Sequence, residues 1–326
     1  MTKSKYCIGV DLGGTNIAVG LVNLENKKIA KQMSVKTNAP RPCEEITKDI
    51  ASVCRKLCAM EGIETSELLW VGVATPGIVK DETVIAAFNL GWKNVPFAKI
   101  FKDEIGRPTY IANDANAAAY AEAMWGSGAG CESLIAFTLG TGVGGGIILN
   151  GKIWEGMNGF AAEMGHMLVE NGGRLCSCGK RGCIEAYCSA TALIQDTKRM
   201  MRLYPESIMW KEVDGDIERV NGKTSFSAAA KGDKAATIVV DDYIDYLAHG
   251  VSNTINIFQP DVVCIGGGIS REGEVLMAPL RDKVFHSSFG IEGSRTKVVA
   301  AEFRNDAGII GAALLGLQKT NLDERQ

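Results

Sequence analysis

The chain has 326 residues, 46% of them apolar and 22% charged, and Lys plus Arg (35) against Asp plus Glu (38) leave a formal net charge of −3. This length allows two domains with their own cores, and the mild acidic balance argues against nucleic-acid binding, which needs a basic face. No apolar run approaches the ~20 residues that span a bilayer, and residues 1–6 lack the pattern of a secretory signal, so we expect a cytoplasmic protein without membrane partners.

The first half of the chain alternates short apolar strands with turns and helices. A glycine turn, Leu12-Gly-Gly-Thr-Asn16, follows the first predicted strand, and Thr75-Pro-Gly77 follows the fourth. The pattern predicts strands at 6–11, 17–23, 28–36, 69–74 and 109–112, and helices at 44–61 and 115–125.

The opening pattern of strand, glycine turn and strand then returns at 133–149, with a turn at 140–146 and a hairpin signal at Asn150-Gly151. We interpret this as an internal duplication, in which two similar halves each offer a glycine turn to a shared cleft. Further on, the pattern predicts helices at 235–258, 272–284 and 307–317, strands at 261–265 and 297–302, and a frayed polar tail at 320–326. Strands that alternate with helices indicate an α/β fold.

One histidine and three cysteines form the most specific motif. Glu163-Met-Gly-His166 is followed after nine residues by Cys176-Ser-Cys178, and Cys183 completes the run. One imidazole and three thiols are a tetrahedral ligand set of the Cys₃His kind, so we predict structural zinc at these four residues. The chain has ten cysteines, but without a secretion signal we expect thiols rather than disulfides.

Two carboxylates, Glu163 and Glu185, flank the predicted zinc site. Glu163 and His166 are three residues apart, so on a helical turn they share a face, and a zinc-bound imidazole keeps one ring nitrogen free to donate. Carboxylates that accept hydrogen bonds from hydroxyl groups, held rigid by a metal, favour a sugar site. The alternative is a purely structural zinc loop.

The first glycine turn has the composition of a phosphate site. Gly13 and Gly14 lack Cβ atoms, so backbone N–H groups can approach an anion closely, and Thr15 and Asn16 can donate further hydrogen bonds. Asp11 is placed to hold a phosphate-bound Mg²⁺, directly or through water. The alternative is an ordinary hairpin turn.

The second glycine turn matches the dinucleotide fingerprint G-x-G-x-x-G at Gly140, Gly142 and Gly145. That fingerprint requires a helix to open at the loop, whereas 147–153 has the pattern of a hairpin. We therefore disfavour a nicotinamide enzyme and predict that Gly140, Thr141 and Gly142 hold phosphate.

A third run, Gly266-Gly-Gly268, follows a predicted strand and precedes a predicted helix. Close backbone approach beside a helix N-terminus suits the ribose, base or α-phosphate of a nucleotide, so Gly267 and Gly268 are predicted nucleotide contacts. A tight strand–helix turn is the alternative, and no Walker-type P-loop sequence is present.

Asn113-Asp114-Ala-Asn116 joins a predicted strand to an Ala-rich helix. Either Asn113 or Asp114 would be a natural N-cap, which is the structural interpretation. The functional interpretation makes Asp114 a general base that accepts the proton of an alcohol as it attacks a γ-phosphoryl group. Asn113 would then bind a neighbouring hydroxyl.

Together these motifs resemble the ROK family, which comprises bacterial sugar kinases, repressors and related open reading frames. Within it the chain is most similar to the glucokinases of Gram-positive bacteria. The resemblance covers essentially the full length and rests on Asp11–Asn16, Ala74-Thr-Pro-Gly77, Asn89-Leu-Gly-Trp92, Asn113–Asn116, Leu139–Gly142, Glu163–His166 and the three cysteines.

The resemblance implies an actin-like ATPase (ribonuclease H-like) α/β fold of two lobes, with ATP and sugar in the cleft between them. We expect a small lobe of 1–113 plus a C-terminal helix at about 306–326, and a large lobe of 114–305. It also implies a homodimer, possibly a tetramer, that uses ATP, Mg²⁺ and structural Zn²⁺. The implied sugar-site residues are Asp114 as the base with Gly77, Asn89, Asn113, Glu163, His166 and Glu185 as contacts.

The implied activity is ATP-dependent phosphorylation of a hexose 6-hydroxyl, with glucose as the first choice. Met164 and Ala161-Ala162 depart from the residues usual beside the sugar site, which leaves N-acetylglucosamine, N-acetylmannosamine, fructose, mannose and allose open. A sugar-responsive repressor is the remote alternative, since only ten residues precede Asp11, too few for a DNA-binding domain.

Overall fold

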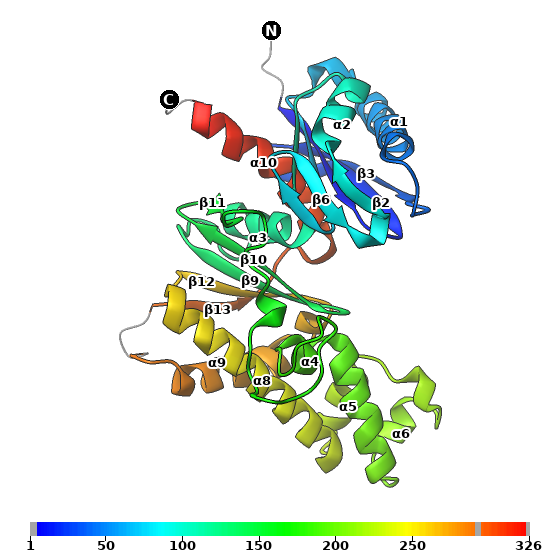
Figure 1. The fold of residues 1–326 in the computed structure, drawn as a ribbon. Helices are drawn as coiled ribbons and strands as arrows, with labels where there is room; N and C mark the ends of the chain where they lie inside the picture. Colours follow the sequence, from blue (N-terminus) through cyan, green and yellow to red (C-terminus); the bar gives the residue numbers. More distant parts are fainter. Residues whose placement is uncertain (1–4, 291–294, 324–326) are drawn as a thin grey trace. The chain divides into compact units, whose positions relative to one another are not determined.

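The computed structural model describes residues 5–290 and 295–323, and the chain divides into two compact units (Figure 1). The first unit comprises 1–130, 146–162 and 303–326, and the second comprises 131–145 and 163–302. Residues 114–130 and 146–162 thus group with the N-terminal residues, whereas the sequence-based boundary at 113/114 assigned them to the large lobe. The lobe boundaries stay a prediction.

The first unit is built on a five-stranded sheet of order β3-β2-β1-β4-β8. β1 and β2, and β2 and β3, pair antiparallel, while β1, β4 and β8 are parallel neighbours. The carboxyl ends of these three parallel strands therefore meet at one edge. The strands are β1 (Tyr6–Leu12), β2 (Asn16–Asn23), β3 (Lys28–Lys36), β4 (Val71–Thr75) and β8 (Thr109–Asn113).

Helices cover both faces of this sheet (Figure 1). Because successive side chains of a strand point to opposite faces, Ile8, Val10 and Leu12 of β1 pack in the cluster that contains α1 and α2, while Cys7 packs with α10 on the other face. The helices are α1 (Cys43–Glu61), α2 (Phe97–Ile105), α3 (Asp114–Met124) and α10 (Ala307–Asp323).

A smaller three-stranded sheet of order β5-β6-β7 also belongs to the first unit. Its strands are β5 (Ile78–Lys80), β6 (Thr83–Ala87) and β7 (Trp92–Val95), and the short helix η2 (Phe88–Leu90) lies between β6 and β7 in the chain. The first unit also contains the short helices η1 (Thr65–Glu67), which contacts α1, and η7 (Arg304–Asp306), which contacts α10. The tail predicted to fray at 320 instead continues α10 to Asp323, and 324–326 lie outside the described residues.

The second sheet has the order β11-β10-β9-β12-β13. Strand for strand, this order corresponds to β3-β2-β1-β4-β8, which confirms the predicted internal duplication. The turn predicted over 140–146 is wrong in length, because β10 begins at Val143. The strands are β9 (Leu134–Leu139), β10 (Val143–Leu149), β11 (Lys152–Ile153), β12 (Val262–Gly267) and β13 (Lys297–Ala300).

The second unit places most of its helices around α8, which contacts α4, α5, α7 and α9. α8 begins after Asp233, whose side chain accepts the Ala236 N–H. The elements are α4 (Glu185–Cys188), α5 (Ala190–Leu203), α6 (Met209–Glu212), α7 (Thr224–Ala229), α8 (Lys234–Phe258), α9 (Glu274–Ser287), η3 (Met164–His166), η4 (Ile217–Arg219) and η5 (Ile269–Glu272). Across 5–290 and 295–323, none of the helices combines the length and the apolar character needed to cross a membrane.

Candidate functional site

The first glycine turn is held by hydrogen bonds at the carboxyl end of β1. The Gly13 N–H donates to the Asn16 oxygen at 2.9 Å, which closes the turn. The buried Thr37 makes two further hydrogen bonds to the turn. Its hydroxyl donates to the backbone oxygen of Gly13 at 2.6 Å, and its N–H donates to the backbone oxygen of Thr15 at 2.9 Å. Thr15 and Asn16 remain exposed, as a turn that binds an anion requires.

Asp11 lies beneath the first turn of α10. A Cβ atom on Gly308 would lie 2.6 Å from the Asp11 carboxyl carbon, so the absence of a side chain at Gly308 leaves room for this carboxylate. Burial, and then the charge of Asp114, raise the pKa of Asp11 to about 6. Two acidic groups that interact in this way suit a divalent cation with oxygen ligands.

The raised pKa of Asp11 predicts a pH-dependent stability. The pKa of Asp11 is about 6 in the folded protein and returns to the ordinary 3.8 in the unfolded chain. Between these two pH values the folded protein therefore holds a proton that the unfolded chain has lost. The ionised carboxylate therefore destabilises the fold fully above pH 6, and the penalty disappears as the pH falls toward 4. We expect Asp11→Asn to raise the melting temperature of the ligand-free protein at pH 7, with a gain that shrinks between pH 6 and pH 4.

Thermal melts of both proteins from pH 4 to pH 8 measure this difference. Asp103→Asn is the control, because Asp103 is an exposed aspartate on α2. A constant gain for Asp11→Asn across the whole range would contradict the raised pKa.

Asn113 caps α3, and Asp114 is the first residue of the helix. The Asn113 side-chain oxygen accepts the N–H groups of Ala115 at 2.9 Å and Asn116 at 3.2 Å. Asp114 is exposed, and its Oδ1 accepts the Ala115 N–H at 2.8 Å. The capping role therefore falls to Asn113, and the carboxylate of Asp114 stands at the surface beside it.

The other sugar contacts predicted in this unit lie nearby. The Asn113 amide donates to the Gly77 oxygen at 2.9 Å. Gly77 has φ 90°, and a Cβ atom there would lie 2.0 Å from the Ala86 oxygen, so only glycine fits. Asn89 is exposed, and its Cβ is 3.2 Å from where a Cβ on Gly14 would stand. The unit thus joins Gly77 to Asn113 and places Asn89 beside the first glycine turn.

The predicted zinc ligands come together in the second unit. The ligand atoms of His166, Cys176, Cys178 and Cys183 all lie within 4.8 Å of one another. The Cys178 and Cys183 sulfurs are 3.7 Å apart, and the Cys176 sulfur is 3.6 Å from His166 Nδ1. A tetrahedron with Zn–S bonds of about 2.3 Å has edges of about 3.8 Å, so the donor set fits Zn²⁺.

We call residues 163–185 the metal loop. Glu163 precedes the 3₁₀ turn η3, and the backbone N–H of His166 donates to the backbone carbonyl oxygen of Glu163 at 3.0 Å. Residues three apart eclipse on such a turn, which agrees with the shared face expected of Glu163 and His166. Since Nδ1 of His166 faces the thiols, Nε2 is the ring nitrogen left to donate elsewhere.

Glu185 connects the metal loop to the second glycine turn. Its Oε1 accepts the Ser177 hydroxyl at 2.7 Å, and its Oε2 accepts the Val143 N–H at 3.1 Å. Gly142 is in close contact, since a Cβ there would lie 2.5 Å from Glu185 Oε2. The Val143 N–H is thus taken by Glu185, and the Gly140 N–H donates to the Gly142 backbone oxygen at 3.0 Å. The phosphate contact of Gly140, Thr141 and Gly142 stays a prediction.

Both glycine turns of this unit lie at the same sheet edge. Leu139 of β9 and Gly267 of β12 are paired in parallel strands, so residues 140–142 and 266–268 follow neighbouring strand ends. The Gly140 oxygen accepts the Ala190 N–H at 2.8 Å, which fixes the second turn to the start of α5.

The helix predicted to begin at 272 starts later. The 3₁₀ turn η5 comes first, and α9 begins at Glu274. Gly267 and Gly268 are exposed and directly precede η5. A ligand could therefore contact their backbone groups, but not the N-terminus of α9, as the sequence had predicted.

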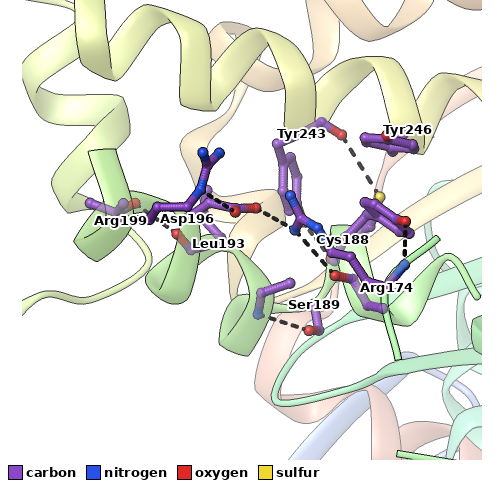
Figure 2. A network of polar contacts seen from close by, with 12 residues as sticks. Arg174, Cys188, Ser189, Leu193, Asp196, Arg199, Tyr243 and Tyr246 are labelled. Atoms are coloured by element: carbon purple, nitrogen blue, oxygen red, sulfur yellow. Dashed lines mark hydrogen bonds and ion pairs between the residues drawn. The ribbon is translucent and has the colours of Figure 1, made fainter. Parts of the chain in front are cut away.

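Figure 2 shows the network that anchors the metal loop, which no sequence motif indicates. Arg174 donates to Asp196 of α5 at 2.6 Å, and its guanidinium lies 4.6 Å from the centre of the Tyr187 ring. The Arg174 N–H donates to the Tyr187 hydroxyl oxygen at 2.8 Å, and Tyr187 stacks on Tyr246 of α8 with ring centres 4.0 Å apart. Arg174 and Tyr187 thus fasten one point of the metal loop to α5 and α8 through contacts that involve none of the predicted zinc ligands.

The chain is similar in sequence and structure to known sugar kinases. The ROK family model matches residues 7–319. The glucokinase of Thermotoga maritima is 39% identical over 316 residues, covering 96% of this chain and 97% of the relative, and that of Halalkalibacterium halodurans is 34% identical over 327 residues, covering 99% and 98%. The ROK family glucokinase from Streptomyces griseus, crystallised with glucose and AMPPNP, superposes with a TM-score of 0.78 at 36% identity over 96% of this chain and 99% of that one. The chain therefore belongs to the ROK family.

Proposed function

We propose that this chain is an ATP-dependent glucokinase that transfers the γ-phosphoryl group of ATP to the 6-hydroxyl of glucose. The full-length similarity to glucokinases supports the reaction class and the substrate. The observation that carries the proposal is the start of α3, where Asn113 takes over the capping and leaves the carboxylate of Asp114 exposed.

In this proposal Asp114 is the general base. The sugar O6 attacks the γ-phosphorus, the O6–P bond forms, and the bond between the γ-phosphorus and the β,γ-bridging oxygen breaks, so that ADP leaves. Asp114 accepts the O6 proton as the new bond forms. Asn113 binds a neighbouring hydroxyl, and its bond to Gly77 fixes the orientation of its amide.

Charge neutralisation of the phosphates falls to the turns and to Mg²⁺. Asp11 would hold the ion, directly or through water, since a cation would offset both the burial of this carboxylate and its repulsion by Asp114, which together raise its pKa. The turns at 13–16, 140–142 and 267–268 would contact the nucleotide, with donors other than the N–H groups of Gly13 and Gly140, which close their own turns. Phosphoryl transfer depends mainly on such positioning and charge neutralisation.

The metal loop is proposed to recognise the sugar. Glu163, Glu185 and Nε2 of His166 would form hydrogen bonds with its hydroxyl groups. Four protein ligands leave zinc no open position, so the ion would act structurally by keeping the loop folded. Removal of zinc is therefore expected to weaken sugar binding.

A panel of hexoses tests the proposed activity. ADP release is measured with glucose, mannose, fructose, allose, N-acetylglucosamine and N-acetylmannosamine at equal concentrations. We expect glucose to give the highest kcat/KM, because one or two contacts in a sugar pocket discriminate among hexoses by about 10- to 200-fold. A higher kcat/KM for another sugar would support the kinase activity but contradict glucose as its preferred substrate.

The contact between Gly142 and Glu185 gives a second test. Gly142→Ala places a Cβ 2.5 Å from Glu185 Oε2, so the carboxylate must move and lose its bond to Val143. We expect the KM for glucose to rise about tenfold, the usual value of a hydrogen bond to a charged group. Gly140→Ala is the matched control, because its nearest contact is the Gly142 oxygen at 4.0 Å. Equal values of KM in the two variants would contradict the role of Glu185.

Two further properties follow from the family resemblance. We propose a homodimer, which light scattering of the purified protein measures directly. We also propose that the protein acts in the cytoplasm, where ATP and unphosphorylated sugar are both available.

A further inference from the structure

Ser177 lies between two of the predicted zinc ligands without belonging to the ligand set. Its side chain is exposed, and its hydroxyl donates to Glu185 Oε1 at 2.7 Å. The Cys176 sulfur is 3.6 Å from the same oxygen. The hydroxyl therefore makes the shortest of the bonds that reach Oε1 of Glu185.

The two oxygens of Glu185 are held from two different segments. Oε1 is held from the metal loop by Ser177, and Oε2 is held from the second glycine turn by the Val143 N–H at 3.1 Å. A glutamate side chain has several rotatable bonds. Hydrogen bonds to both oxygens of its carboxylate therefore exclude rotamers that the free side chain would populate. With the Ser177 hydroxyl removed, Oε1 is left with the longer 3.6 Å contact to the Cys176 sulfur, and the carboxylate can rotate about its bond to the Val143 N–H.

We propose that Ser177 is a positioning residue for sugar recognition, because its hydroxyl orients Glu185 between the metal loop and the second glycine turn. This inference rests on the proposed function, in which Glu185 contacts the sugar. Ser177 itself contributes no metal ligand, so its effect is separable from that of the zinc site. It acts on the affinity for the sugar and leaves the general base, Asp114, unchanged.

The test compares Ser177→Ala with Ser177→Thr, which keeps the hydroxyl. For both variants we measure zinc per chain, the Kd for glucose by calorimetry, and kcat and KM for glucose and for ATP. We expect Ser177→Ala to raise the Kd and KM for glucose by about 3- to 10-fold, the range of a partly exposed hydrogen bond to a carboxylate. Zinc content, kcat and the KM for ATP should stay at the wild-type values, and Ser177→Thr should restore most of the glucose affinity.

Glu185→Ala, which removes the acceptor of the Ser177 hydroxyl, separates this inference from the proposed function. If the effect of Ser177 passes through Glu185, then Ser177→Ala adds little to Glu185→Ala, and the two substitutions are not additive. Additive effects, an unchanged Kd in Ser177→Ala, or a loss of zinc in that variant would each overturn the inference while the kinase activity stands. If the wild-type protein phosphorylates no hexose, the proposed function fails before the variants are compared.

Discussion

Replacing Asp114 with Asn is expected to lower kcat for glucose phosphorylation by a factor of ~10²–10⁴, the usual contribution of a positioned general base. The amide keeps the size of the side chain and can still accept the Ala115 N–H that Asp114 accepts at 2.8 Å. It cannot accept a proton from the attacking hydroxyl. The Kd for glucose should therefore change little, and the loss should appear in kcat.

Steady-state kinetics and calorimetry on the same preparation check this result. Asp103→Asn is the matched control, since it removes an exposed carboxylate from α2 of the same unit. We expect the control to keep the wild-type kcat. A variant of Asp114 that binds glucose normally and turns over at nearly the wild-type rate would show that another group is the base.

Replacing Cys178 with Ser is expected to remove zinc from the protein and to weaken glucose binding. Cys178 is the exposed member of the cluster, and its sulfur is 3.7 Å from that of Cys183. A hydroxyl is a poor replacement for a thiolate on Zn²⁺, so the affinity for zinc should fall by at least ~10²-fold, more than the loss of an outer partner costs. Because loop folding and metal binding are coupled, the Kd for glucose should rise with the loss of metal.

Metal analysis after dialysis, followed by glucose titration, measures both effects. Cys131→Ser is the control, because Cys131 is a partly exposed thiol of the same unit outside the cluster. One zinc per chain in both variants would rule out the Cys₃His ligand set. Full glucose affinity in a zinc-free Cys178→Ser protein would instead leave the zinc structural without a role in sugar binding.

The repeated architecture could be predicted because the spacing of apolar residues and the position of glycine turns are local features of the sequence. Apolar runs bounded by glycine gave the strands of both halves, and the matching strand orders of the two sheets confirm the duplication. The ends of elements were less predictable. Val143 opens β10 although it stands within a glycine-rich run, because pairing with neighbouring strands overrides the weak strand preference of glycine.

The site could be predicted to the level of residue types but not of contacts. The predicted zinc ligands could be picked out because their chemistry and spacing lie in one short segment, and the structure brings all four together. The close approach of Asp11 to Gly308 involves residues from opposite ends of the chain, so no local sequence pattern could predict it. Ser177 gave a weak signal by its position between two ligands, but its bond to Glu185 depends on how the loop folds.

The most direct test of the proposed function is to identify the product formed from glucose and ATP by phosphorus and proton NMR. The proposal predicts one ADP per glucose consumed and a phosphoryl group bonded to O6, with Asp114→Asn forming the same product far more slowly. Phosphate on another hydroxyl, or ADP release that does not depend on a sugar, would contradict it.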